Sequence, residues 1–169
     1  MMMRFLMAAA LAVSLPLTAL HASELAEPAG DVVLTVTGLI TNTNGDGAAD
    51  FDAAMLAALP ARDTVTETPW HEGTPTFSGP LGTALLDAVG ATGGTLRITA
   101  LNDYSVDVPV SDLRDYPVIF ATHLDGAPMA VRDKGPIFLI YPFSEYPELL
   151  NEVQFGRSAW QIRSIEVLE

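Results

Sequence analysis

VRDKGPIFLIYP, residues 131–142, places a charged loop directly before an apolar segment. Arg132 and Lys134 precede a Gly-Pro pair, which favours a break in regular structure. The residues that follow, Ile137 to Tyr141, form an apolar run typical of a buried strand. The stretch therefore predicts two cations held at the entrance of a core strand. An ordinary solvated turn is the alternative interpretation of the charged part.

Hydrophobic periodicity on both sides of this stretch predicts one small domain. The expected strands cover residues 32–38, 64–68, 95–100, 104–108, 118–124, 137–141 and 160–168, and the expected helices cover 51–59, capped by Asp50, and 81–89, with a short helical piece at 111–116. The connection from Ser144 to Ser158 is expected to be a long loop of the kind that forms lids or binding sites. This pattern indicates a single α+β domain with short strands, two main helices and long loops.

The first 22 residues have the pattern of a secretory signal peptide. Arg4 supplies the basic start, Phe5 to Leu20 the apolar segment and Ala22 the small residue at the cleavage point. We expect a flexible lead over residues 23–31 and the folded domain over residues 32–169. The protein is thus expected in the periplasm, with no stable membrane insertion after signal cleavage. An uncleaved anchor is the alternative, which the shortness of the apolar run disfavours.

Charge and cysteine content exclude several classes of function. The chain has a formal net charge of −13, and removing residues 1–22 takes away one cation and no acid. Such a field repels nucleic acid and anionic lipid surfaces, so no nucleic-acid partner is expected. The sequence has no cysteine, which excludes disulfides, cysteine nucleophiles and thiolate metal sites. It also lacks the glycine-rich motifs typical of dinucleotide and nucleoside triphosphate sites.

The segment NTNGDGAADFD, residues 42–52, partly follows the pattern of a calcium loop. Asn42, Asn44 and Asp46 alternate as oxygen ligands would, and Gly47 stands where such loops need a glycine. The twelfth position is Ala53, where calcium loops have a bidentate acid. We therefore expect a solvated turn here, with a weak calcium site as the alternative.

Three stretches together resemble a known family. Residues 131–142, with Ala100 to Tyr104 upstream and Trp160 to Ile162 downstream, resemble the sulfite-oxidase-type molybdopterin-binding domain family. The resemblance covers Val32 to Leu168. Within the family, the chain resembles more specifically a small, exported, cysteine-free branch of periplasmic pterin-binding signalling proteins. It implies a single sulfite-oxidase-like molybdopterin-binding domain.

The resemblance also shows what this chain lacks. In catalytic members, the cysteine that ligates molybdenum precedes a Gly-x-x-Leu helix start, which corresponds here to Gly79 to Gly82. The preceding segment offers only hard or borderline donors, namely Glu67, Thr68, His71 and Glu72. We therefore expect no bound metal and assign no catalytic residue. If the protein is an enzyme, the resemblance implies a molybdopterin-dependent oxidoreductase.

A pterin or molybdopterin-like ligand needs three kinds of partner. Its flat ring needs aromatic faces, its edge needs amide or carboxylate groups, and a phosphorylated side chain needs cations. The candidate residues for these needs, in that order, are Trp70, Tyr104 and Trp160, then Asn102 and Asp103, then Arg132 and Lys134. That these residues converge is implied by the resemblance.

Two main hypotheses for function remain at this point. The first is a non-catalytic periplasmic module that binds a pterin and reports it to a membrane signalling partner. The second is a molybdopterin-dependent oxidoreductase with an altered, thiolate-free metal site. The missing cysteine favours the first, because metal affinity in this family depends on that thiolate. An exported structural domain without a small ligand is the third option.

Overall fold

The computed structural model describes residues 25–169, so the expected signal peptide and the first two residues of the expected lead lie outside the described residues. The strands are β1 (Val32–Gly38), β2 (Ala49–Asp52), β3 (Ala61–Val65), β4 (Thr76–Pro80), β5 (Thr95–Ala100), β6 (Ser105–Pro109), β7 (Ile119–Ala121), β8 (His123–Leu124), β9 (Ala127–Pro128), β10 (Phe138–Ile140) and β11 (Ile162–Leu168). The helices are α1 (Ala53–Ala58), α2 (Gly82–Val89), α3 (Val110–Asp115) and α4 (Glu152–Arg157), with short 3₁₀ turns at Val131–Asp133 and Pro147–Leu149. This composition confirms the α+β class.

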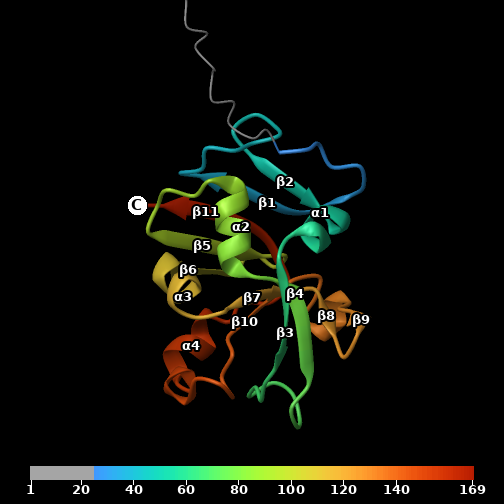
Figure 1. Cartoon of the computed structure of the whole chain (residues 1–169), viewed down its shortest axis with the longest axis vertical. Coiled ribbons are helices and arrows are strands. Elements are labelled where there is room, and N and C mark those ends of the chain that lie inside the picture. Colours follow the sequence, from blue (N-terminus) through green and yellow to red (C-terminus); the bar gives the residue numbers. More distant parts are fainter. Residues whose placement is uncertain (1–24) are drawn as a thin grey trace, which may run out of the picture.

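A five-stranded sheet with the order β2-β1-β11-β5-β6 forms the larger half of the fold. Its central pair, β1 and β11, joins the two ends of the domain in parallel, with Thr35 opposite Ser164 and Gly38 opposite Val167. The other pairs in this sheet are antiparallel. Figure 1 shows α2 crossing one face of this sheet. Because β1 pairs with β11, the five-stranded sheet can form completely only when both ends of the domain are present.

The second half contains a four-stranded sheet, β3-β4-β8-β9, and the pair β10-β7. The β3–β4 hairpin extends away from the larger sheet (Figure 1). The strand expected over residues 118–124 is divided between these sheets as β7 and β8. Before Thr122 the chain pairs with β10, and after it the chain pairs with β4. Thr122 marks this change of partner, because its amide donates to Ser78 O and its carbonyl accepts from the Met129 amide. One apolar run thus serves two sheets.

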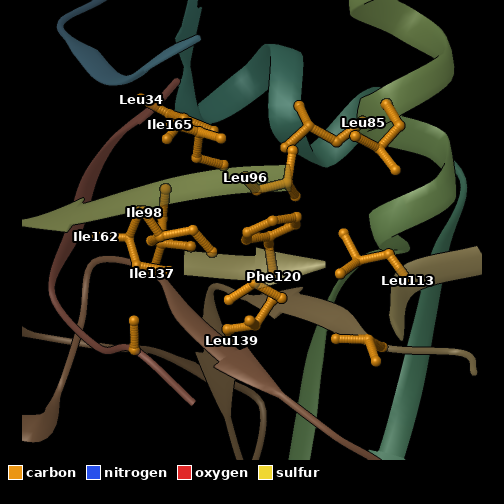
Figure 2. Close-up of a cluster of buried hydrophobic side chains, with 14 of the residues drawn as sticks. Leu34, Leu85, Leu96, Ile98, Leu113, Phe120, Ile137, Leu139, Ile162 and Ile165 are labelled. Atoms are coloured by element: carbon orange, nitrogen blue, oxygen red, sulfur yellow. The ribbon is translucent and has the colours of Figure 1, made fainter. Parts of the chain in front are cut away.

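Two hydrophobic clusters hold these layers together. The larger lies between the five-stranded sheet, α2 and the β10-β7 pair, and Figure 2 shows residues from all three parts, among them Leu85, Leu96 and Phe120, meeting in it. The smaller cluster lies beside β4 and includes Phe77 and Phe138. Trp70 packs against both clusters. Trp70 therefore lies where the two halves of the fold meet.

Several expected elements agree closely with the structure. The strands expected at 32–38 and 95–100 are β1 and β5 with the same bounds, and the helix expected at 81–89 is α2, with Leu81 as its N-cap. The strand expected at 160–168 begins at Ile162, because Gln161 has a φ of 54°. The strand expected at 64–68 is shifted toward the N-terminus and ends at Val65.

The cap of the first helix was assigned wrongly to Asp50. The strand β2 continues to Asp52, so α1 begins at Ala53 and Asp52 is its N-cap, with Oδ1 accepting a hydrogen bond from the Met55 amide at 2.8 Å. Asp50 instead accepts a hydrogen bond of 2.6 Å from the Thr35 hydroxyl on the paired strand. Residues 51 and 52, which were expected in the first turn of the helix, thus belong to the strand β2.

Asn44 organises the turn in which the calcium pattern occurs. Its side-chain amide donates to Ala26 O and Asp50 O, and its oxygen accepts from the Asp50 amide at 2.8 Å. Both ends of the Asn44 side chain are therefore used by the backbone of the turn. Over residues 25–169 no group of three His, Asp or Glu side chains is placed to hold a metal ion.

Asp52 also ties the lead to the domain and makes stability depend on pH. Its Oδ2 accepts hydrogen bonds from the amides of Ala29 and Gly30, both at 2.9 Å. The backbone hydrogen bond from Met55, followed by that from Gly30, lowers the pKa of Asp52 below its ordinary 3.8. This contribution to stability is present above the unfolded-state pKa and is lost as pH falls through the lower folded-state pKa.

We expect the Asp52→Asn variant to melt below the wild-type protein at neutral pH, because the neutral amide accepts weaker hydrogen bonds than the carboxylate. The two melting temperatures should begin to converge below about pH 4, where the carboxylate of the unfolded chain becomes protonated, and should meet only once pH has fallen through the lower folded-state pKa of Asp52. Melting curves followed by circular dichroism between neutral and acidic pH measure this difference. Two parallel curves across that range would contradict the role assigned to Asp52.

Candidate functional site

An aromatic pocket of about 410 Å³ lies between the β5–β6 turn, α4 and the residues that precede β11. Its walls are mostly apolar or aromatic, with few polar groups. It is lined by Trp70, Ala100, Asn102, Tyr104, Phe155, Gly156, Ser158, Ala159 and Trp160. A pocket with this composition is the usual form of a site for a small organic ligand.

The β5–β6 turn places Asn102 and Tyr104 at the pocket. The turn is closed by the Ala100 amide, which donates to Tyr104 O at 2.9 Å, and by Asp103, whose φ is 66°. The Leu101 amide donates to Gln161 O at 2.9 Å, which fixes the turn beside Trp160. The turn thus joins β5 and β6 as a hairpin, and its attachment to Gln161, the residue before β11, makes it part of the pocket.

Trp70 and Trp160 form an aromatic corner. Their ring centroids are 5.8 Å apart and their planes meet at 65°. Trp70 also makes edge contacts with Phe138 at 5.5 Å and Phe155 at 6.0 Å, which hold its ring in place. Because the two indoles are far from parallel, a flat ligand can stack on one of them while its edge meets the other.

Lys134 brings a positive charge to this corner. Its ammonium group lies 5.2 Å from the centroid of the Trp160 ring, within the range of a cation–π contact. Its carbonyl accepts a hydrogen bond of 3.0 Å from the Gln161 amide, and the Gln161 side chain donates to Val131 O at 2.7 Å. Gln161 therefore joins the cationic loop to the pocket. No feature of the sequence around residue 161 indicated this role.

Lys134, Asp103 and Arg132 lie outside the pocket lining, and Lys134 reaches the corner only through its contact with Trp160. The side chain of Arg132 is 86% exposed and contacts Asp133 at 3.3 Å. Asp103 is held by the guanidinium of Arg163, with Nη2 2.5 Å from Oδ1. The structure thus brings together five of the seven predicted residues, Trp70, Asn102, Tyr104, Lys134 and Trp160.

The helix α4 forms one wall of the pocket through Phe155 and Gly156. It lies in the connection from Ser144 to Ser158, which was expected to be a loop, so that prediction was wrong for residues 152–157. Asn151 begins the helix by accepting hydrogen bonds from the amides of Val153 and Gln154. An Asn followed by Glu152 was the available signal for this cap.

A buried hydrogen-bonded group fastens α4 to the core. Asp112 Oδ2 accepts hydrogen bonds from the Tyr141 hydroxyl at 2.8 Å and from Arg157 Nη1 at 2.9 Å. Burial, and then the neighbouring Asp112 carboxylate, raise the pKa of Tyr141 well above its usual range, so the hydroxyl stays a neutral donor. The orientation of the pocket wall therefore depends on a carboxylate in α3.

His71 lies next to Trp70, in the segment that was compared above with the cysteine-bearing segment of the resembled family. Its Nδ1 is 2.9 Å from Thr68 Oγ1, and its ring packs edge-on against Phe77 at 5.3 Å. Burial, and then the charge of Lys134, lower the pKa of His71, which favours the neutral imidazole at neutral pH. These contacts fix the Trp70 segment.

Comparisons with known proteins bear on the fold. No family model matches the sequence, and no curated protein sequence matches it. Among solved structures, the chain is similar to the sulfane dehydrogenase SoxCD from Paracoccus pantotrophus, with 16% sequence identity and a TM-score of 0.59. The match covers 80% of this chain and 37% of the matched SoxCD chain, so it spans little more than a third of that chain. At this level of identity the likeness shows the fold alone, and the chain has a sulfite-oxidase-like fold.

Proposed function

We propose that this chain binds a pterin, or a closely related flat heteroaromatic molecule, in the aromatic pocket. The observation that carries the proposal is the corner formed by Trp70 and Trp160, with Lys134 over one indole and Asn102 on the facing turn. The corner supplies a stacking surface, a cation and an amide for one ligand. Its volume of about 410 Å³ lies near the small end of ligand pockets, about 300–1,000 Å³, which suits one bicyclic ring with a short side chain.

The proposed role is binding without catalysis. A molybdopterin-dependent oxidoreductase with a thiolate-free metal site is the alternative, but the residues present do not fit molybdenum. Glu67 and Glu72 are exposed, and Thr68 and His71 contact each other. None of these is a soft ligand. Elemental analysis showing about one molybdenum per chain, in protein purified from its own periplasm, would favour the enzyme instead.

Reporting to a membrane signalling partner is the second part of the proposal. It rests on the resemblance to exported pterin-binding proteins and on the expected signal peptide. Exposed side chains at the pocket support it, because Tyr104 in the lining is 54% exposed and Leu101, in the same turn, is 46% exposed. A ligand bound there would lie within reach of a second protein. Among the described residues, no helix is long and apolar enough to cross a bilayer.

Blocking the pocket at Gly156 tests ligand binding directly. Gly156 lines the pocket, and a Cβ added to it would meet no atom within 4 Å. We expect wild-type protein to show saturable quenching of tryptophan fluorescence with pterin. We expect Gly156→Leu to weaken that binding by about tenfold to a hundredfold, the range lost when one stacked base contact is removed.

Val153→Leu is the matched control for this variant. Val153 lies on the same helix, is 56% exposed and does not line the pocket. Its variant should bind pterin as the wild-type protein does, and both variants should keep the wild-type melting temperature within a few degrees. If pterin failed to quench the wild-type fluorescence, or if Gly156→Leu bound as tightly as Val153→Leu, the aromatic pocket would not be the ligand site.

A further inference from the structure

We propose that the pocket recognises hydrogen-bond acceptors on its ligand and does not read the amino-bearing edge of a pterin. This inference rests on the proposed function and adds the orientation of the ligand. A pterin carries donors, its amino group and the adjacent ring N–H, on one side of the pyrimidine ring. Its carbonyl oxygen and the remaining ring nitrogens accept. A pocket whose side chains supply mainly donors would favour the second set of atoms.

Asn102 presents a donor because its oxygen is already used. The Tyr104 amide donates a hydrogen bond of 3.2 Å to Asn102 Oδ1 within the β5–β6 turn. A backbone N–H can only donate, so the side-chain oxygen must face it and the amide NH₂ faces the other way. In the part of the chain that the structure describes, the NH₂ group makes no hydrogen bond of its own. It is therefore available to a ligand acceptor.

The other polar groups around the corner are also mostly donors. The indole nitrogens of Trp70 and Trp160 can only donate, and so can the ammonium group of Lys134. The Ser158 hydroxyl already donates its proton to Gln154 O at 2.9 Å, so its oxygen would be an acceptor, but Ser158 is only 1% exposed and presents almost no surface to a ligand. The Tyr104 hydroxyl can accept, but Tyr104 lies at the rim, where water competes for it.

Carboxylates are the usual acceptors for an amino group beside a ring N–H, since two oxygens meet two donors. Within residues 25–169 the pocket lining contains no Asp or Glu. Asp103 is next to Asn102 in sequence, but Arg163 holds its side chain outside the pocket. Burying the amino-bearing edge would leave its donors without partners, which is unfavourable. That edge is therefore expected to face the open side of the pocket.

Pterin and lumazine form the test pair, because lumazine has the same bicyclic ring with a carbonyl oxygen in place of the amino group and a hydrogen on the neighbouring ring nitrogen, so the two differ only at the amino-bearing edge. Both are titrated into the wild-type protein in mildly acidic buffer, where both rings are uncharged, and tryptophan quenching gives the affinities. We expect the two dissociation constants to agree within about threefold, because an edge that faces water contributes little to selectivity. Pterin binding at least about tenfold more tightly than lumazine would overturn this inference, since a hydrogen bond from the pterin amino group to the protein would raise the affinity by about that factor.

Asn102→Asp provides the converse arm. The aspartate keeps an oxygen for the Tyr104 amide and exchanges the free NH₂ donor for a second acceptor. We expect lumazine affinity to fall by about tenfold or more, because each of its ring N–H groups stands beside carbonyl oxygens that the carboxylate repels. Pterin can turn its amino group and the adjacent ring N–H toward the carboxylate together, so it should lose less. Asp103→Asn is the matched control, since Asp103 lies outside the lining, and it should change neither affinity.

The two proposals fail in different ways. If neither ring binds the wild-type protein, the proposed function is overturned and this inference falls with it. If both rings bind and Asn102→Asp lowers both affinities equally, or lowers neither, the pocket binds pterins but Asn102 does not select acceptors. In that case only the inference is overturned.

Discussion

Gly38→Ala is expected to lower the free energy of unfolding by about 3 kcal/mol or more, or the melting temperature by about 10 °C. Gly38 ends β1 with a φ of +87°, a conformation in which an L side chain costs about 1–2 kcal/mol. A Cβ there would also lie inside contact distance of the backbone of Val167 on the paired strand, 2.9 Å from its nitrogen. Neither strand can shift easily, because β1 and β11 pair in the middle of the larger sheet.

Gly47→Ala separates the two causes. Gly47 has a similar φ of +75°, but a Cβ there would meet no atom within 4 Å. This variant should therefore lose only the conformational part, about 1 kcal/mol. Urea denaturation of both variants gives the comparison. Equal losses would show that the contact with Val167 adds nothing, and that the central strand pair tolerates movement at this point.

Regular periodicity explains which elements could be predicted. β1, β5 and α2 each carry an uninterrupted apolar pattern that ends at a glycine or a turn, and their observed bounds differ from the expected ones by at most one residue. In these segments local preference and burial agree, so sequence alone is enough. The strand over residues 118–124 was harder, because its division at Thr122 depends on which sheet each part joins.

Short elements and caps were less predictable. Asp50 and Asp52 are both good N-cap residues, and only the length of β2 decides between them. The helix α4 has six residues, too few for a clear helical repeat, and it is stable because Phe155 and Arg157 contact the core. Such elements are determined by tertiary contacts that a single sequence does not show.

The site was predictable in its residue types and only partly in its geometry. Five of the seven predicted residues meet, because the turn at Asn102 and the loop at Lys134 both attach to Gln161. Arg132 and Lys134 are two positions apart and looked equivalent. The short 3₁₀ turn places Lys134 over Trp160 and leaves Arg132 in solvent. Spacing alone could not distinguish them, since both lie in one exposed loop.

Asp112→Ala is expected to cost about 2–4 kcal/mol of stability, because it removes the acceptor shared by two donors. Tyr141 is fully buried and would keep an unpaired hydroxyl, and the side chain of Arg157 is only 25% exposed. Pterin binding should weaken as well, because Arg157 ends the helix that forms the pocket wall. Urea denaturation and fluorescence titration measure the two effects.

Tyr141→Phe distinguishes the two donors of this group. It removes one hydrogen bond and leaves Asp112 paired with Arg157, so we expect a loss of about 1–2 kcal/mol with little change in pterin affinity. Arg157→Met should weaken pterin binding, because it frees the end of α4 while the Tyr141 hydrogen bond remains. If all three variants bound pterin equally well, the attachment of α4 to Asp112 would serve stability alone. The pocket wall would then be held in place by the packing of Phe155 against Trp70 and Phe143.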